Sequence, residues 1–223
     1  MHLLYTINFW MRFATAITLG LIFWLVFVQM SPVYFSLVLA LVLCCIMLFE
    51  WLPMVRRVGV PLLVLTPFYP ILPFCLLIIL NNTPLLRPLL YFLFCLVFAF
   101  DTGSYLVGNL YGNHLICPTI SSRKTWEGFI GGFVCALIAV LILLYQYTVV
   151  QSWFSIVSMT LTICFIALFG DLFESWLKRK AGLKDSGTLL PGHGGFLDRF
   201  DGIMFVVFFA YVYRYQFIIL LGI

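Results

Sequence analysis

Long apolar runs separated by short polar segments dominate the chain. Seven of them approach or reach the roughly 20 residues that a helix needs to cross a bilayer. They are Phe13–Met30, Val33–Phe49, Val58–Leu80, Leu89–Val107, Phe129–Val149, Trp153–Gly170 and Ile203–Leu221. The third run contains four prolines, so we expect it to be kinked or broken. The pattern predicts an all-α protein, a polytopic bundle of about seven transmembrane helices.

The composition agrees with a membrane protein. Of the 223 residues, 64% are hydrophobic and 9% are charged, against roughly 25% charged residues in a soluble domain. The first run lacks a signal-peptidase pattern and is followed by further spans, so we expect an uncleaved helix. An amphipathic piece before Arg12 is expected to lie along the interface.

The seven cysteines predict neither a zinc site nor a disulfide framework. Six of them lie inside apolar runs, and no C-x-x-C pair or Cys/His cluster with zinc spacing occurs. We interpret them as small buried hydrophobic side chains.

The charged residues concentrate on one side of the predicted bundle. Ten of the twelve basic residues fall in the segments 1–12, 50–57, 108–128 and 171–202. Arg87 and Arg214 fall on the other side. The positive-inside rule makes the basic side, with the N-terminus, cytoplasmic. All eight acids lie on or near that side as well, which the rule does not require. Acids and bases together predict a metal and anion site in a cleft on the cytoplasmic side.

Two polar segments that flank apolar runs carry candidate chemistry. Asp101–Tyr105 ends the fourth run and places an aspartate near the membrane surface, where it needs a cation, a metal or water. The alternative is a structural ion pair with a neighbouring helix. Ser121–Gly128 has the features of a helix start, whose N–H groups, together with Lys124, suit phosphate. The alternative is a basic interfacial anchor with a tryptophan among the headgroups.

A third segment runs from residue 171 to residue 201. Its polar stripe along one helix face consists of Asp171, Glu174, Ser175 and Lys178. Pro191–Gly195 follows as a glycine-rich loop whose backbone suits a phosphate chain. Asp198 and Asp201 share a face where the last helix starts. The alternative, a solvated basic loop, leaves the acids and glycines unexplained.

These residue types together suit nucleotidyl or phosphoryl transfer. A divalent metal held by carboxylates neutralises anionic oxygens and orients the attacking and leaving groups. Aspartates and phosphate oxygens are the ligands that Mg²⁺ prefers, and lysine and arginine stabilise a departing pyrophosphate. His193 suits three roles: a donor to phosphate, a proton relay, or a residue that orders the glycine loop.

The third segment also resembles a known family. Ser175–Asp201 matches S-x-hydrophobic-K-R-x4-K-D-x-G-x2-L-P-x-H-G-G-hydrophobic-x-D-R-hydrophobic-D at every specified position. This is similar to the signature motif of phosphatidate cytidylyltransferases, also called CDP-diacylglycerol synthases. The resemblance covers about residues 98–210, with Ser122 where family members often have proline. Relative to the family, we expect one or two N-terminal spans to be lacking and the catalytic half to be complete.

The resemblance implies a Mg²⁺-dependent enzyme that condenses CTP with phosphatidic acid to give CDP-diacylglycerol and pyrophosphate, with K⁺ completing the metal centre. It implies a homodimer among the lipids of the bacterial inner membrane, with no nucleic-acid partner. The implied metal ligands are Asp171, Asp198 and Asp101. The implied catalytic residues are Lys178, Arg179, Lys184, His193 and Asp201. The implied substrate-binding residues are Ser121, Lys124, Ser175, Gly194, Gly195 and Arg199.

We expect residues 1–88 to form N-terminal transmembrane helices and residues 89–223 the catalytic transmembrane region of a single module. One alternative function is a CTP-dependent polyprenol or phytol kinase, which transfers the γ-phosphoryl group and releases CDP. A remote alternative is an anion transporter with Asp101, Arg87 and Arg214 along its path. Transporters tend to show inverted repeats and midplane sites, whereas the acids here gather at one surface.

Overall fold

The computed structural model describes residues 18, 20–21, 23–145, 152–187, 189 and 194–222. Its elements in chain order are η1 (Leu25–Gln29), α2 (Pro32–Cys45), η2 (Ile46–Trp51), α3 (Leu52–Val58), α4 (Val60–Leu65), η3 (Pro67–Ile71), α5 (Leu72–Asn82), α6 (Arg87–Tyr111), α7 (Trp126–Leu144), α8 (Trp153–Lys180), α9 (Leu197–Val212) and α10 (Arg214–Leu221). Over these residues no strand forms, and an isolated bridge pairs Leu115 with Thr125. The predicted all-α class is confirmed.

Within the described part of the chain, five helical stretches are long and apolar enough to cross a membrane. They are Pro32–Val58, Val60–Asn82, Arg87–Tyr111, Trp126–Leu144 and Trp153–Lys180. Helices α9 and α10 form a sixth candidate that is bent by 87°. Seven of the eighteen residues of the predicted run Phe13–Met30 lie outside the described residues, as does the whole piece before Arg12. The predicted count of about seven is approximate, and the protein is a multi-pass membrane protein.

The apolar runs break at two places. The expected break in the third run is confirmed, because Tyr69 has extended backbone angles (φ −152°, ψ 114°) between α4 and α5. The last predicted run, Ile203–Leu221, also breaks, because the chain bends by 87° between α9 and α10. At this bend the Arg214 guanidinium donates to the Tyr211 carbonyl at 2.7 Å and lies over the Tyr215 ring. A charged side chain in an apolar run thus finds its partners where the helix breaks.

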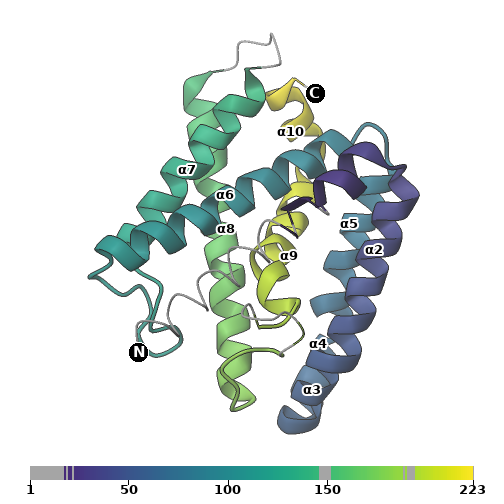
Figure 1. Ribbon diagram of the computed structural model, residues 1–223, viewed down its shortest axis with the longest axis vertical. Coiled ribbons are helices and arrows are strands. Elements are labelled where there is room, and N and C mark those ends of the chain that lie inside the picture. Colours follow the sequence, from purple (N-terminus) through teal and green to yellow (C-terminus); the bar gives the residue numbers. More distant parts are fainter. Residues whose placement is uncertain are drawn as a thin grey trace.

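Helix α9 connects α8 with the pair formed by α2 and α5. It lies between α8 on one side and the α2–α5 pair on the other, and α6 crosses both α8 and α9 (Figure 1). Helices α6 and α7 pack very closely, since a Cβ at Gly132 would lie 2.6 Å from the carbonyl oxygen of Phe100. Glycine at this position lets the two backbones approach.

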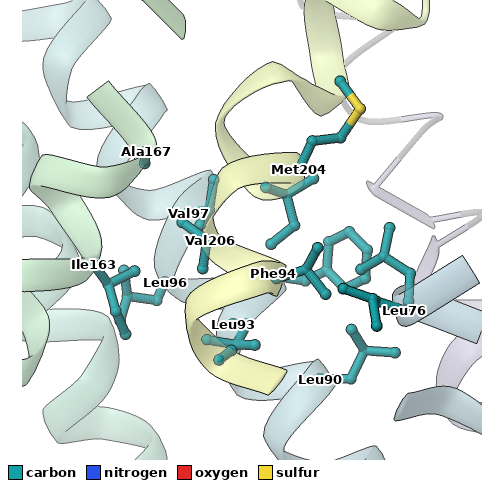
Figure 2. Packing of buried hydrophobic residues seen from close by; sticks show 14 of the residues in the cluster. Leu76, Leu90, Leu93, Phe94, Leu96, Val97, Ile163, Ala167, Met204 and Val206 are labelled. Atoms are coloured by element: carbon teal, nitrogen blue, oxygen red, sulfur yellow. The ribbon is translucent and has the colours of Figure 1, made fainter. Parts of the chain in front are cut away.

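The core where these helices meet is apolar. Figure 2 shows Leu93 and Val97 of α6 against Val206 of α9, with Ile163 of α8 and Leu76 of α5 on either side. All five side chains are buried. This packing fixes the ends of α6, α8 and α9 relative to one another, and those ends carry the polar segments.

Candidate active site

One pocket brings the three polar segments together. Its volume is about 330 Å³, and it lies among the second half of α6, the loop before α7, α8 and the start of α9. The predicted site residues that line it are Asp101, Ser121, Lys124, Asp171, Ser175, Lys178, Asp198, Arg199 and Asp201. Ser104, Arg123 and Asp185 line it as well. The separate segments expected from the sequence therefore form a single cavity.

The start of α7 determines the position of the segment Ser121–Gly128. Thr125 caps this helix, with its hydroxyl oxygen accepting from the Gly128 N–H at 3.1 Å. This confirms the helix start expected in Ser121–Gly128, since threonine at such a position satisfies an N–H group that has no partner within the helix. The cap holds Lys124, the preceding residue, at the pocket.

Lys124, in the segment before α7, forms an ion pair with Asp171 of α8. This pair joins Ser121–Gly128 to the motif region, residues 171–201. The Lys124 side chain is 27% exposed, so water screens the pair only in part. Burial lowers the pKa of the Lys124 ammonium below its usual value, while the charges of Asp201 and Asp101 act in the opposite direction. A partly buried lysine among carboxylates suits an anionic ligand, such as a phosphate, that binds together with a metal ion.

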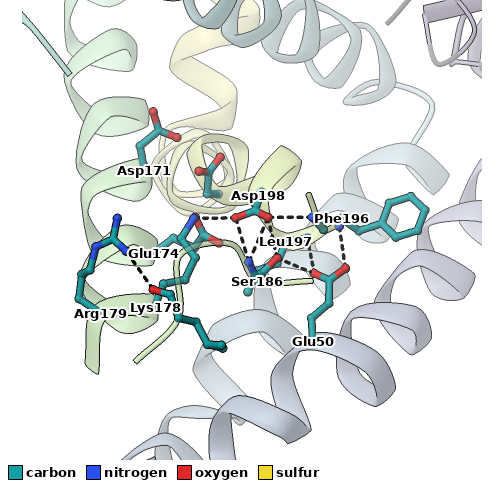
Figure 3. A network of polar contacts seen from close by, with 12 residues as sticks. Glu50, Asp171, Glu174, Lys178, Arg179, Ser186, Phe196, Leu197 and Asp198 are labelled. Atoms are coloured by element: carbon teal, nitrogen blue, oxygen red, sulfur yellow. Dashed lines mark hydrogen bonds and ion pairs between the residues drawn. The ribbon is translucent and has the colours of Figure 1, made fainter. Parts of the chain in front are cut away.

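Lys178 is the second cation of the pocket. Its Nζ lies 2.8 Å from Glu174 Oε2 and 2.6 Å from Asp198 Oδ1 (Figure 3). Glu174 is fully buried, whereas Asp171, Ser175 and Lys178 line the pocket. The predicted polar stripe on α8 therefore faces the site, and its fully buried member, Glu174, pairs with Lys178.

Asp198 organises the loop that precedes α9. Besides Lys178, its carboxylate accepts from the Ser186 N–H at 3.2 Å, the Ser186 hydroxyl at 2.9 Å and the Gly195 N–H at 2.8 Å. Gly194 has a φ of +81°, and a Cβ there would lie 2.6 Å from Asp198 Oδ2. The described glycines of the loop thus wrap the carboxylate, and their predicted contact with phosphate stays a prediction.

Four predicted residues do not line the pocket: Arg179, Lys184, Gly194 and Gly195. The Arg179 guanidinium donates to the carbonyl oxygens of Leu183 at 3.0 Å and Ile120 at 3.4 Å, so it ties the end of α8 to the loop before α7. Lys184 is exposed. His193 lies outside the described residues.

Glu50 contacts the loop of the site although the sequence motifs did not include it. Its side chain is fully buried on η2, far from the motif in sequence. Its Oε1 accepts from the Phe196 N–H at 2.7 Å, and its Oε2 accepts from the Leu197 N–H at 2.8 Å (Figure 3). The available signal was a lone acid between Phe49 and Trp51, since an ionisable residue among apolar ones points to a function.

The carboxylates of the pocket suit a divalent metal by their chemistry. Asp101, Asp171, Asp198 and Asp201 all line one cavity, and Mg²⁺ prefers oxygen ligands of this kind. Among the described residues, no three His, Cys, Asp or Glu side chains converge closely enough to hold an ion. The ammonium groups of Lys124 and Lys178 lie against two of these carboxylates. The oxygen donors are of the kind that Mg²⁺ prefers, and the expected magnesium site stays a prediction.

Fold and site define a class: a multi-pass membrane protein with a pocket of lysines, arginines and aspartates at the ends of its helices. Residues 5–217 match the Cytidylyltransferase family, and the chain belongs to this family. The family expected from the motif is thereby confirmed.

The chain is also similar to proteins named phosphatidate cytidylyltransferase. It is 48% identical over 114 residues to one from Staphylococcus aureus (strain COL) and 46% identical over 114 residues to one from Staphylococcus haemolyticus (strain JCSC1435). These alignments cover 51% of the chain and 44% of each relative, so the chain matches less than half of the relatives' length.

Proposed function

We propose that the protein is a phosphatidate cytidylyltransferase, which condenses CTP with phosphatidic acid to give CDP-diacylglycerol and pyrophosphate. The observation that carries the proposal is the single pocket in which Lys124, Lys178 and Arg199 lie among five aspartates at the ends of membrane helices. Cations suit the triphosphate, and the position suits a lipid headgroup. Membership of the Cytidylyltransferase family supports the use of a cytidine nucleotide.

The reaction needs little acid–base chemistry. The phosphate of phosphatidic acid has a second pKa of about 6, so it is largely a dianion at neutral pH. An oxygen of this phosphate attacks the α-phosphorus of CTP, the bond to the β-phosphate oxygen breaks, and pyrophosphate leaves. Lys124, Lys178 and Arg199 bind the anionic oxygens and align the two substrates, so catalysis is mostly positioning and electrostatic stabilisation.

Asp171 and Asp198, with Asp101 nearby, are the residues that would hold Mg²⁺, and K⁺ would complete the centre. When bound, the metal supplies charge neutralisation at the phosphate oxygens. Lys124 and Lys178, which pair with Asp171 and Asp198 in this structure, would bind phosphate oxygens of CTP once a metal neutralised those carboxylates. Asp201 supports the site as a neighbouring acid.

We further propose a homodimer in the bacterial cell membrane, with the pocket on the cytoplasmic side. The distribution of basic residues supports this orientation, and CTP then enters from the compartment in which it is made. Labelling of single cysteines placed in the loop 112–125 of intact cells, with a reagent that cannot cross the membrane, tests the orientation. Labelling before lysis would place the pocket outside.

The activity is tested with purified protein, dioleoyl phosphatidic acid, Mg²⁺ and CTP labelled at the α-phosphate. The proposal expects the label in chloroform-soluble lipid, with one pyrophosphate released per label transferred. Label recovered in water-soluble CDP would instead indicate a lipid kinase, for which a polyprenol is the acceptor to supply. Uptake of label into proteoliposomes without a lipid product would indicate a transporter.

A further inference from the structure

The strongest unassigned feature of the molecule is the buried carboxylate of Glu50. It lies on η2, in the N-terminal helices, and its side chain has no solvent exposure. Among the described residues, its hydrogen-bond partners come from the motif region, 136 to 147 residues further along the chain. Burying a charge in a membrane bundle is costly unless hydrogen bonds or an opposite charge offset the loss of water. A buried carboxylate of this kind therefore indicates a function.

Glu50 caps helix α9 from another part of the chain. The first N–H groups of a helix lack partners within it and carry a partial positive charge. The Phe196 and Leu197 N–H groups donate to the two Glu50 oxygens at 2.7 and 2.8 Å. Asp198 is the next residue of α9, and Asp201 follows one turn later. The cap therefore fixes the helix end that carries two aspartates of the pocket.

Glu50 also reaches Asp198 through Ser186. The buried Ser186 hydroxyl lies 3.0 Å from Glu50 Oε2 and 2.9 Å from Asp198 Oδ2 (Figure 3). Asp198 in turn pairs with Lys178 at 2.6 Å. A continuous polar chain thus runs from the N-terminal helices to the lysine of the pocket.

Two glycines of the motif make room for Glu50. A Cβ at Gly195 would lie 2.6 Å from Glu50 Oε1, and one at Gly187 would lie 2.9 Å from Glu50 Cγ. Both contacts are too short for a side chain, so the loop closes on Glu50 only because these residues are glycines. The neighbouring Trp51 packs against Tyr69, and Tyr69 packs against Phe173 of α8. These rings hold η2 against the catalytic helices.

We propose that Glu50 is a positioning residue for the catalytic loop: it sets the place of Asp198, and through Asp198 that of Lys178, without touching substrate. The proposal rests on the proposed function of the pocket. A carboxylate suits this role because both of its oxygens accept, one from the Phe196 N–H and one from the Leu197 N–H. Glutamine has nearly the same shape but directs an NH₂ group at one of these donors, so it keeps the packing and loses part of the cap.

The test compares Glu50→Gln and Glu50→Ala with the control Asn81→Ala. Asn81 is likewise fully buried in the N-terminal helices, where it donates to the Pro32 carbonyl and the Ser36 hydroxyl, away from the loop. Initial rates are measured over a range of CTP concentrations. Amide hydrogen exchange is followed in peptides covering 184–187 and 194–200, with α6 and α7 as internal references.

We expect Glu50→Ala to lower kcat and to speed exchange at residues 195–198, each by about tenfold or more, because hydrogen bonds to a charged acceptor are lost. Glu50→Gln should show the same pattern to a smaller extent. Asn81→Ala should lower the melting temperature and leave kcat within about twofold of wild type, as expected for a change that acts on packing alone.

Three outcomes would test the positioning role of Glu50 and separate it from the proposed function. Wild-type kcat and loop exchange in Glu50→Ala would overturn the proposal. Exchange that rises equally in α6, α7 and the loop of Glu50→Gln would also overturn it, because Glu50 would then serve global stability. If the wild-type protein forms no labelled lipid, the proposed function fails, and the exchange data still decide whether Glu50 holds the loop.

Discussion

Lys178 and Asp198 form an ion pair, with 2.6 Å between Nζ and Oδ1, that joins the last turns of α8 to the first turn of α9. The same ammonium lies 2.8 Å from Glu174, which is fully buried. Two residues from opposite ends of the signature motif therefore neutralise each other across the loop between them. The motif therefore links α8 to α9 as well as supplying the chemical groups of the pocket.

Removal of this ammonium should destabilise the protein. Lys178→Met leaves Glu174 and Asp198 buried without a counter-charge, and breaking a buried ion pair in this way costs about 3–5 kcal/mol of unfolding free energy. Thermal denaturation in detergent measures the loss. The double variant Lys178→Met with Glu174→Gln should recover part of it, since one of the uncompensated charges is gone. Equal melting temperatures for wild type and Lys178→Met would contradict the pairing.

Neutralising either proposed metal ligand should abolish turnover. Asp171→Asn and Asp198→Asn each remove a negative charge from the pocket, and we expect the rate of label transfer from CTP to lipid to fall by about 10²–10³-fold, as for other losses of transition-state electrostatics. The protein should still be recovered from the membrane fraction. Glu127→Gln is the control, because Glu127 pairs with the exposed His114 and does not line the pocket.

Near-normal rates in either aspartate variant would remove that residue from the site. Titration of Mg²⁺ separates a metal ligand from a loop organiser. Loss of metal binding raises the concentration of Mg²⁺ needed for half-maximal rate. A displaced loop lowers the rate at every concentration of metal.

The site was predicted best where the spacing of residues along one helix determines the direction in which their side chains point. Asp171, Ser175 and Lys178 share a face of α8 at helical spacing, and all three line the pocket. Arg179 was expected beside Lys178 because it follows it in the motif. Successive helical residues point about 100° apart, so Arg179 faces the neighbouring loop instead.

The role of Glu50 could not be predicted because it depends on how distant helices pack. Nothing in residues 50–57 indicates that η2 lies against the start of α9, because the pattern there predicts only a polar stretch between two spans. The contact also crosses the expected division at residues 88 and 89, which stays a prediction. Long-range packing, set by rings such as Tyr69 and Phe173, determines that partner.

The close approach of α6 and α7 gives a further prediction. At Gly132, a Cβ would lie 2.6 Å from the Phe100 carbonyl oxygen and would collide with the Ser104 side chain. Gly132→Ala should therefore lower stability by about 1–3 kcal/mol, the usual cost of overpacking. Gly202→Ala is the matched control, since the nearest atoms there lie at 3.5 Å, an ordinary contact. Similar melting temperatures for the two variants would contradict the packing.

Arg179 and Lys184 should respond differently from the lysines that line the pocket. Lys184 is exposed, so its contribution to binding the triphosphate is screened, and Lys184→Ala should raise the KM for CTP by about two- to fivefold with little change in kcat. Arg179→Ala frees the Ile120 carbonyl and loosens the loop that carries Ser121 and Lys124. We therefore expect a fall in kcat that Arg179→Lys, which can still donate one hydrogen bond, restores in part. Initial rates at varied CTP separate the two effects, and an unchanged KM in Lys184→Ala would exclude Lys184 from nucleotide binding.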